Sequence, residues 1–205
     1  MNQYFKNNFF RGIILFWLVG GILILTTDKL TLHKSINGFN SNFLDLVTPF
    51  ATHIGDGLFA IALSVLIFFF DKKNAVLLFL SFLISAGITQ FLKQVVFSDA
   101  MRPMYYFQND DCFHIVHGIT IHTQNSFPSG HATTCFAIFG ILTLIYSQKK
   151  YLEFLFFICV LFFSFTRVYL SQHFFEDVYA GSFVGTLTTC IVWQIKDKIS
   201  FLKKL

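Results

Sequence analysis

The sequence is poor in charged residues and in proline. Only 13% of its 205 residues are Asp, Glu, Lys or Arg, about half of the roughly 25% that soluble domains carry. Hydrophobic residues make up 55% and aromatic residues 19%, with 30 Phe, which is more apolar surface than one small soluble core buries. This composition excludes a disordered or fibrous chain and argues against a soluble globular domain. Three prolines and no Gly/Ser-rich run leave no sign of a linker, so we expect residues 1–205 to form a single domain.

Cysteine is also scarce, and its spacing suggests neither a metal site nor a disulfide. Cys135, Cys159 and Cys190 fall within apolar runs, and Cys112 stands alone in a polar segment. We therefore expect all four to behave as small hydrophobic residues. No metal and no cofactor is predicted from them.

What the sequence does have is six long apolar runs. A helix needs about 20 predominantly apolar residues to cross a bilayer. The second and fourth runs reach that length only with their flanking residues. We predict an all-α protein, a polytopic membrane helical bundle with six transmembrane helices. The runs lie near Gly12–Leu25, Leu58–Phe70, Ala75–Phe97, Ala132–Tyr146, Leu152–Leu170 and Val178–Ile195.

The placement of basic residues predicts the orientation of this bundle. With both termini inside, the inner segments hold ten of the fifteen Lys and Arg residues. Short cytoplasmic loops retain basic residues, so we expect both termini in the cytoplasm. The net charge of +4 is then a signal of topology, and we expect no nucleic-acid partner. The outer segments hold the other five, Lys29, Lys34, Lys93, Arg102 and Arg167.

Two connections between the apolar runs are long, and both lie on the outer side by this count. They are Asp28–Gly57 and Ser98–Pro128. Long structureless connections are uncommon in compact proteins and are usually functional. We expect residues 98–128 to form an outer loop over the active site. Unusual polar residues from four helix ends flank this loop, namely Lys93, Arg102, Ser129, Gly130, His131, Arg167, His173 and Asp177.

The segment Pro128-Ser129-Gly130-His131 precedes an apolar run and is typical of a helix start. A helix N-terminus presents unpaired backbone N–H groups and the positive end of the helix dipole, so it can hold an anion. Gly130 would let that backbone approach a ligand closely. Lys93, Arg102 and Arg167 would add three cations, which together favour a phosphate group.

His173 and Asp177 are four residues apart, hence on one face of a helix. A carboxylate bonded to one imidazole nitrogen leaves the other free as a nucleophile or base. His131, on another helix, would then serve as the general acid.

The role of several polar residues has two interpretations. Lys and Arg beside a membrane are often interfacial anchors. Asp56 would contact a substrate or cap the second transmembrane helix, and Asp110 and Asp111 would bind a cation or simply face water. We expect the remaining histidines to be helix caps or surface residues, namely His33, His53, His114, His117 and His122.

Taken together, these motifs resemble the type 2 phosphatidic acid phosphatases, also called lipid phosphate phosphatases. The family signature is Lys, then Arg-Pro, then Pro-Ser-Gly-His, then Ser-Arg-x5-His-x3-Asp. Eight residues separate Lys93 from Arg102 where the common pattern has six, and Thr166 stands where Ser is usual. The matching positions are Lys93, Arg102-Pro103, Pro128-Ser129-Gly130-His131, Thr166-Arg167, His173 and Asp177.

The resemblance implies a metal-independent membrane phosphatase that acts on a phosphomonoester or pyrophosphate of a lipid. His173 would form a phosphohistidine, Asp177 would orient it, and His131 would protonate the leaving group. The phosphoryl oxygens would be held by Lys93, Arg102, Ser129, Gly130 and Arg167.

The resemblance further implies a multi-pass protein of a bacterial inner membrane, with the active site on the periplasmic or outer face and a membrane lipid as its partner. Undecaprenyl pyrophosphate, phosphatidic acid, phosphatidylglycerol phosphate and lipid A all remain open as substrates, as does the oligomeric state. A lipid-to-lipid phosphotransferase would use the same site. A non-enzymatic transporter would instead place polar residues near the membrane midplane.

Overall fold

The computed structural model describes residues 2–198, and every regular element within them is a helix, as predicted. Each of the six apolar runs forms a helix. In chain order the elements are α1 (Asn2–Lys6), α2 (Asn8–Thr26), α3 (Lys29–Asn37), α4 (Asn42–Ala51), η1 (Thr52–Gly55), α5 (Gly57–Phe68), α6 (Lys72–Phe91), η2 (Leu92–Val96), α7 (Pro103–Phe107), α8 (Gly130–Ile145), α9 (Lys150–Tyr169), α10 (Phe175–Ile195) and η3 (Lys196–Lys198).

The number of membrane spans is smaller than six by length and composition. Within residues 2–198, four helical stretches are long and apolar enough to cross a membrane: α2, α6 with η2, α9, and α10 with η3. The pair α4–η1 and α5, bent by 61°, counts as a fifth if it is one span. Helix α8 has 16 residues, about 24 Å at 1.5 Å per residue, which is short of the roughly 30 Å hydrocarbon core. The six-span prediction is therefore not confirmed.

The first long connection, Asp28–Gly57, is not the structureless loop that we expected. It folds into α3, α4 and η1 because polar side chains satisfy the free N–H groups at two helix starts. Asp28 accepts hydrogen bonds from the amides of Leu30 and Thr31, and Ser41 accepts one from Leu44. Such capping stabilises a helix by about 1 kcal/mol. The second connection, residues 98–128, contains one regular element, α7.

Helix α8 is the centre of the bundle, and 12 of its 16 residues are buried. It packs against α10, α6 and α9. Small and hydroxyl side chains fill these interfaces, and two hydroxyl pairs join the helices: Thr89 donates to Thr133 at 3.1 Å, and Ser81 lies 3.3 Å from Thr189. Interfaces of this kind are typical of helices that associate within a membrane.

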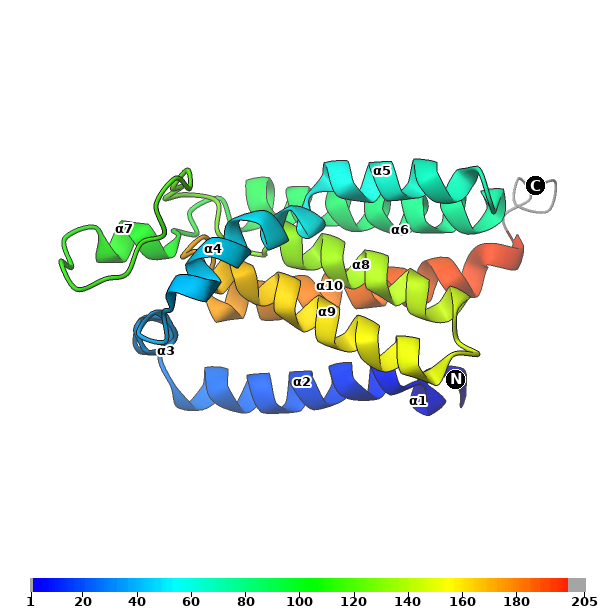
Figure 1. The fold of residues 1–205 in the computed structure, drawn as a ribbon, viewed down its shortest axis with the longest axis horizontal. Helices are drawn as coiled ribbons and strands as arrows, with labels where there is room; N and C mark the ends of the chain where they lie inside the picture. Colours follow the sequence, from blue (N-terminus) through cyan, green and yellow to red (C-terminus); the bar gives the residue numbers. More distant parts are fainter. Residues whose placement is uncertain (1, 199–205) are drawn as a thin grey trace.

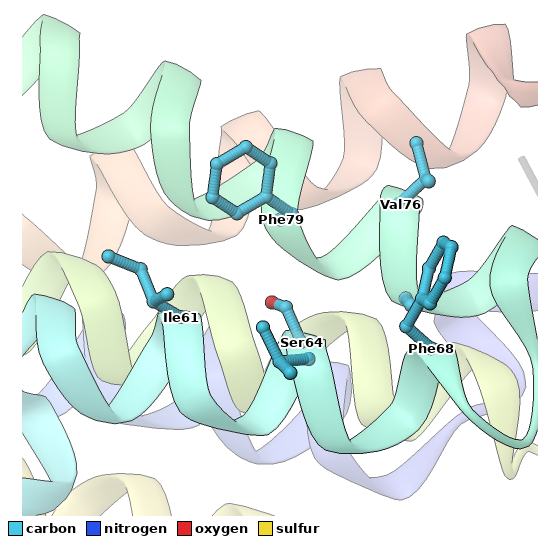
Figure 2. A pocket seen from close by; sticks show the side chains of 7 residues that line it. Ile61, Ser64, Phe68, Val76 and Phe79 are labelled. Atoms are coloured by element: carbon cyan, nitrogen blue, oxygen red, sulfur yellow. The ribbon is translucent and has the colours of Figure 1, made fainter.

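The outward faces of α2, α5, α6 and α9 carry exposed Leu, Ile, Val and Phe side chains. An apolar groove of about 210 Å³ runs between α5 and α6, lined by side chains such as Ile61, Phe68 and Phe79 (Figure 2). Ser64 also lines the groove, and its hydroxyl donates to the Ala60 carbonyl at 2.7 Å. The groove therefore offers an apolar wall that suits hydrocarbon chains.

The helices run roughly along one long axis, which gives the molecule two distinct ends (Figure 1). Helix α1, the end of α10 and the turn between α8 and α9 lie at one end. Helices α3, α4 and α7 lie at the other, together with the start of α8 and the end of α9. All the site residues named from the sequence belong to this second end.

Gly185 of α10 tests how closely α10 and α8 must pack, and Gly87 of α6 serves as its control. A Cβ on Gly185 would overlap the Thr133 carbonyl oxygen and lie 2.7 Å from the Phe136 Cβ, whereas a Cβ on Gly87 would meet nothing within 4 Å. Overpacking costs about 1–3 kcal/mol. Gly185→Ala should lower the Tm of the detergent-solubilised protein by roughly 2–10 °C. Gly87→Ala should leave the Tm equal or higher, because Ala favours a helix over Gly. Equal shifts in the two variants would contradict this packing.

Candidate active site

The starts of α8 and α10 are joined directly. Ser129 is the N-cap of α8, as the sequence predicts, and its hydroxyl accepts a hydrogen bond from the Ala132 amide at 3.4 Å. The Ser129 amide donates to the backbone carbonyl of Asp177 in the first turn of α10, at 2.9 Å. A Cβ on Gly181 would lie 2.6 Å from the Ser129 carbonyl oxygen. The two helix starts can approach this closely only because residue 181 is Gly.

His173 lies just before α10, fully buried, with its ring fixed by Asp177. Its Nδ1 is 3.3 Å from Asp177 Oδ2. The same oxygen accepts the Phe174 amide at 2.8 Å and the Ser126 hydroxyl at 2.5 Å. Because the carboxylate accepts from Nδ1–H, the other ring nitrogen, Nε2, is left unprotonated in the neutral imidazole. That nitrogen is the one available for nucleophilic attack.

The surroundings keep the His173 ring neutral. Burial and the nearby cations Arg102, Lys93 and Arg167 hold the pKa of His173 well below its usual value of 6.5, because each of them disfavours the protonated form. At neutral pH the ring therefore carries no charge.

Lys93 and Arg102 are held by the end of the outer loop. Lys93 lies in the π-helical turn η2, and its Nζ donates to the Asn125 carbonyl at 3.0 Å. Arg102 donates through Nε to the Gln124 carbonyl at 2.7 Å and through Nη1 to the Gln172 carbonyl at 3.1 Å. Neutral carbonyl oxygens orient both side chains and leave their charges unpaired.

Arg167 completes the cluster from the end of α9. Its Nη1 donates to the Thr52 hydroxyl at 2.8 Å, and its buried Nε has no hydrogen-bond partner among residues 2–198. Burying an unpaired donor is costly, and a bound anion would remove that cost. Among residues 2–198 none of the three cations forms a salt bridge with a carboxylate, so this end of the bundle is suited to an oxyanion.

His131, in the first turn of α8, has a partner that the sequence did not reveal. Its Nε2 lies 2.6 Å from Asp56 Oδ1, and the other Asp56 oxygen lies 2.6 Å from His53 Nδ1. Asp56 precedes α5, yet its side chain makes no capping hydrogen bond. Asp56 thus occupies the N-cap position of α5, one of its two expected roles, but its carboxylate does not cap the helix.

A cavity of about 290 Å³ lies beside part of this cluster. His131 and Arg167 line it together with Thr52, His53, Asp56 and His122, among others. His173 lies within electrostatic range of His131, Lys93, Arg102 and Arg167. The structure thus brings the predicted nucleophile, acid and cations into one region, with Ser129 and Gly130 at the helix start beside them.

Several other polar residues at this end of the bundle have structural partners. His33 is buried rather than capping or exposed, which corrects our expectation, and its Nε2 lies 3.2 Å from the Ser171 hydroxyl. Burial lowers the pKa of His33 to about 4. His114 bonds Asp45 at 2.8 Å, and Asp110 pairs with Lys34 at 2.6 Å. His117 and Asp111 are exposed.

Sequence reasoning missed three residues that hydrogen-bond the predicted site residues and orient them. Ser126 bonds Asp177, Thr52 bonds Arg167, and Gln172 bonds Arg102. Their residue types are common in loops. Each of the three lies 51 to 115 residues away in sequence from the residue that it bonds. No spacing rule identifies them.

Comparison with known proteins finds one family and two similar crystal structures. A sequence model of the PAP2 superfamily matches residues 74–201. Aquifex aeolicus LpxE has a TM-score of 0.71 and 23% sequence identity, covering 82% of this chain and 96% of that one. The first transmembrane PAP2 type phosphatidylglycerolphosphate phosphatase from Bacillus subtilis has a TM-score of 0.61 and 23% identity, covering 98% of both chains. No curated protein sequence gives a significant match.

The cation cluster predicts oxyanion binding that depends on Arg167. Orthovanadate should raise the Tm of the solubilised protein, since a ligand at a hundredfold its Kd stabilises the folded state by about 2.7 kcal/mol. Arg167→Gln should weaken vanadate affinity at least tenfold. Arg11→Gln is the matched control, because Arg11 is exposed on α2 and should keep the wild-type affinity. Equal vanadate affinity in the two variants would contradict the assigned anion site.

Proposed function

Because the chain belongs to the PAP2 superfamily, we propose that it is an integral-membrane phosphatase that removes phosphate from a lipid through a phosphohistidine. One observation carries this proposal most directly. The ring of His173, oriented by Asp177, stands in a cluster of three cations, none of which forms a salt bridge with a carboxylate among residues 2–198. A neutral nucleophile beside an oxyanion receptor is the arrangement that phosphoryl transfer requires.

In the first step, His173 Nε2 attacks phosphorus, and the bond from phosphorus to the lipid oxygen breaks. His131 gives a proton to the departing lipid alkoxide, which leaves as the alcohol. Asp177 stabilises the charge that develops on the His173 ring. Lys93, Arg102, Arg167 and the helix start at Ser129 and Gly130 hold the phosphoryl oxygens.

In the second step, water attacks the phosphorus atom of the phosphohistidine. His131, now neutral, takes a proton from that water as the general base. The P–N bond breaks, inorganic phosphate leaves and both histidines return to their starting states. One imidazole thus serves as acid and then as base.

Charge neutralisation in this scheme comes from side chains. In many phosphoryl-transfer enzymes Mg²⁺ neutralises the charge on the transferring group. Here Lys93, Arg102 and Arg167 would supply three positive charges at the same place, so we propose that turnover needs no divalent ion.

The substrate is proposed to be a lipid because the site lies at the end of an apolar bundle. The helices carry exposed apolar side chains on their outward faces, so a lipid could keep its tails in the bilayer while its phosphate enters the site. The B. subtilis structural relative is described as a phosphatidylglycerolphosphate phosphatase, which supports a phosphorylated headgroup of this class as the first substrate to test.

We further propose that the protein resides in a bacterial inner membrane with its active site facing outward. The support is the excess of Lys and Arg at the end that carries α1 and the turn between α8 and α9, because cytoplasmic loops retain basic residues.

The mechanism predicts that His173→Ala loses all phosphate release from phosphatidylglycerol phosphate, phosphatidic acid and undecaprenyl pyrophosphate, since no covalent intermediate can form. His117→Ala, an exposed histidine of the outer loop, is the matched control and should retain wild-type turnover. Wild-type activity should persist in excess EDTA. Residual turnover in His173→Ala would refute the nucleophile, and loss in EDTA restored by a divalent ion would refute the metal-free scheme.

The orientation of the protein in the membrane can be tested by labelling a native cysteine. Cys112 is exposed in the outer loop, so a membrane-impermeant maleimide should label it in cells whose inner membrane is intact. In a Cys112→Ser background, Gln148→Cys, on the turn between α8 and α9, should be labelled only after lysis. The reverse pattern would invert the proposed topology.

A further inference from the structure

Asp56 is the one carboxylate that touches His131 among the described residues, and it lies outside the motifs quoted above. Its Oδ1 is 2.6 Å from His131 Nε2, and its Oδ2 is 2.6 Å from His53 Nδ1. Each oxygen therefore serves a different imidazole. The side chain makes no capping bond to α5, so helix capping does not account for its position.

The fold delivers Asp56 to this place through the break between η1 and α5. The two segments are bent by 61°, and Asp56 stands at the bend in extended backbone conformation. A Cβ on the preceding Gly55 would lie 3.0 Å from His131 Cβ and 3.2 Å from Cys135 Sγ. The glycine thus lets η1 pack directly on the first turn of α8, which sets the carboxylate against the His131 ring.

The charges around His131 explain why a carboxylate is useful there. A general acid must carry its proton before the leaving group departs. His131 is largely buried, with 27% of its side chain exposed, and it lies near Arg167 and Lys93. Burial and positive neighbours both disfavour an imidazolium ion, and a carboxylate in contact with the ring offsets them.

We propose that Asp56 is a positioning residue that holds His131 by Nε2 and sustains its protonated form. This inference rests on the proposed phosphatase function. With Nε2–H donated to Asp56, the proton that moves is the one on Nδ1: it passes to the lipid oxygen as the P–O bond breaks. Neutral His131 then keeps Nε2–H on Asp56, and its bare Nδ1 accepts the proton of the attacking water. Asp56 itself gains and loses no proton.

His53 supports the carboxylate from the solvent side. Its side chain is 71% exposed, so it lies at the mouth of the cavity rather than among the reacting groups. Its bond to Oδ2 fixes the rotation of the Asp56 carboxylate and leaves Oδ1 facing His131. We expect His53→Gln to have a smaller effect than any change at Asp56.

The test compares Asp56→Asn on two substrates with different leaving groups. A lipid alkoxide departs poorly without a proton, whereas p-nitrophenolate departs readily. The parameter measured is kcat/KM, which reports only the steps through departure of the leaving group. Asp56→Asn should lower kcat/KM roughly 10- to 100-fold on the lipid phosphate, and by less than threefold on p-nitrophenyl phosphate. Asp56→Glu, which keeps the charge, should recover part of the loss.

A double-mutant cycle separates a role through His131 from a structural one. If Asp56 acts through His131, adding Asp56→Asn to His131→Ala should cause no further loss. Asp45→Asn is the matched control, because Asp45 bonds His114 at 2.8 Å on the same end of the molecule. Any effect of Asp45→Asn should be equal on the two substrates.

Each other outcome has a definite meaning. Equal losses on the two substrates, or additive losses in the double mutant, would overturn the positioning role while the phosphatase function stood. If Asp56→Asn does not fold, Asp56→Ser removes the carboxylate within a smaller volume and is judged by the same ratio. Absence of phosphate release from every lipid phosphate by the wild-type protein would instead overturn the proposed function.

Discussion

The close contact between the starts of α8 and α10 is the constraint on which the rest of the site depends. Ser129 N donates to the Asp177 carbonyl, and Gly181 and Gly185 let the two backbones meet. One helix start carries His131, and the other carries Asp177 and follows His173. Their relative position is therefore set by main-chain packing in the buried centre of the bundle, which is stiffer than any loop. The surrounding segments then place the three cations beside this junction.

Those cations come from separate parts of the chain, and neutral groups hold all three. Carbonyl oxygens orient Lys93 and Arg102, and a hydroxyl orients Arg167. If carboxylates held them, their positive charge would be neutralised within the protein, and they would bind a phosphate only weakly. Carboxylates instead contact the two histidines, Asp177 at His173 and Asp56 at His131. This division places negative charge beside the two imidazole rings and leaves the positive charge of the cations available to an oxyanion.

The sequence predicts what is local and repetitive, and it misses what depends on three-dimensional proximity. The apolar runs, the N-cap at Ser129 and the i, i+4 pair of His173 and Asp177 follow from short-range rules, and all three appear in the structure. The helices within Asp28–Gly57 have cap signals that the polar, loop-like composition of that segment concealed. The pairing of Asp56 with His131 has no short-range signal at all, since 75 residues separate the two. The span count is uncertain from sequence because a central helix such as α8 is surrounded by other helices and can be shorter than the bilayer core.

The loop of residues 98–128 divides into two parts that differ in how directly they contact the candidate active site. Its last residues, Gln124, Asn125 and Ser126, are bonded to Arg102, Lys93 and Asp177, so a change there would reach the reaction centre. The middle of the loop, from α7 to about residue 119, makes its polar contacts with α3 and α4 instead. Insertions or exchanges in that stretch can therefore be accommodated without changing the contacts of Lys93, Arg102 or Asp177. The cation cluster can therefore stay unchanged while the middle of this loop changes in length and composition.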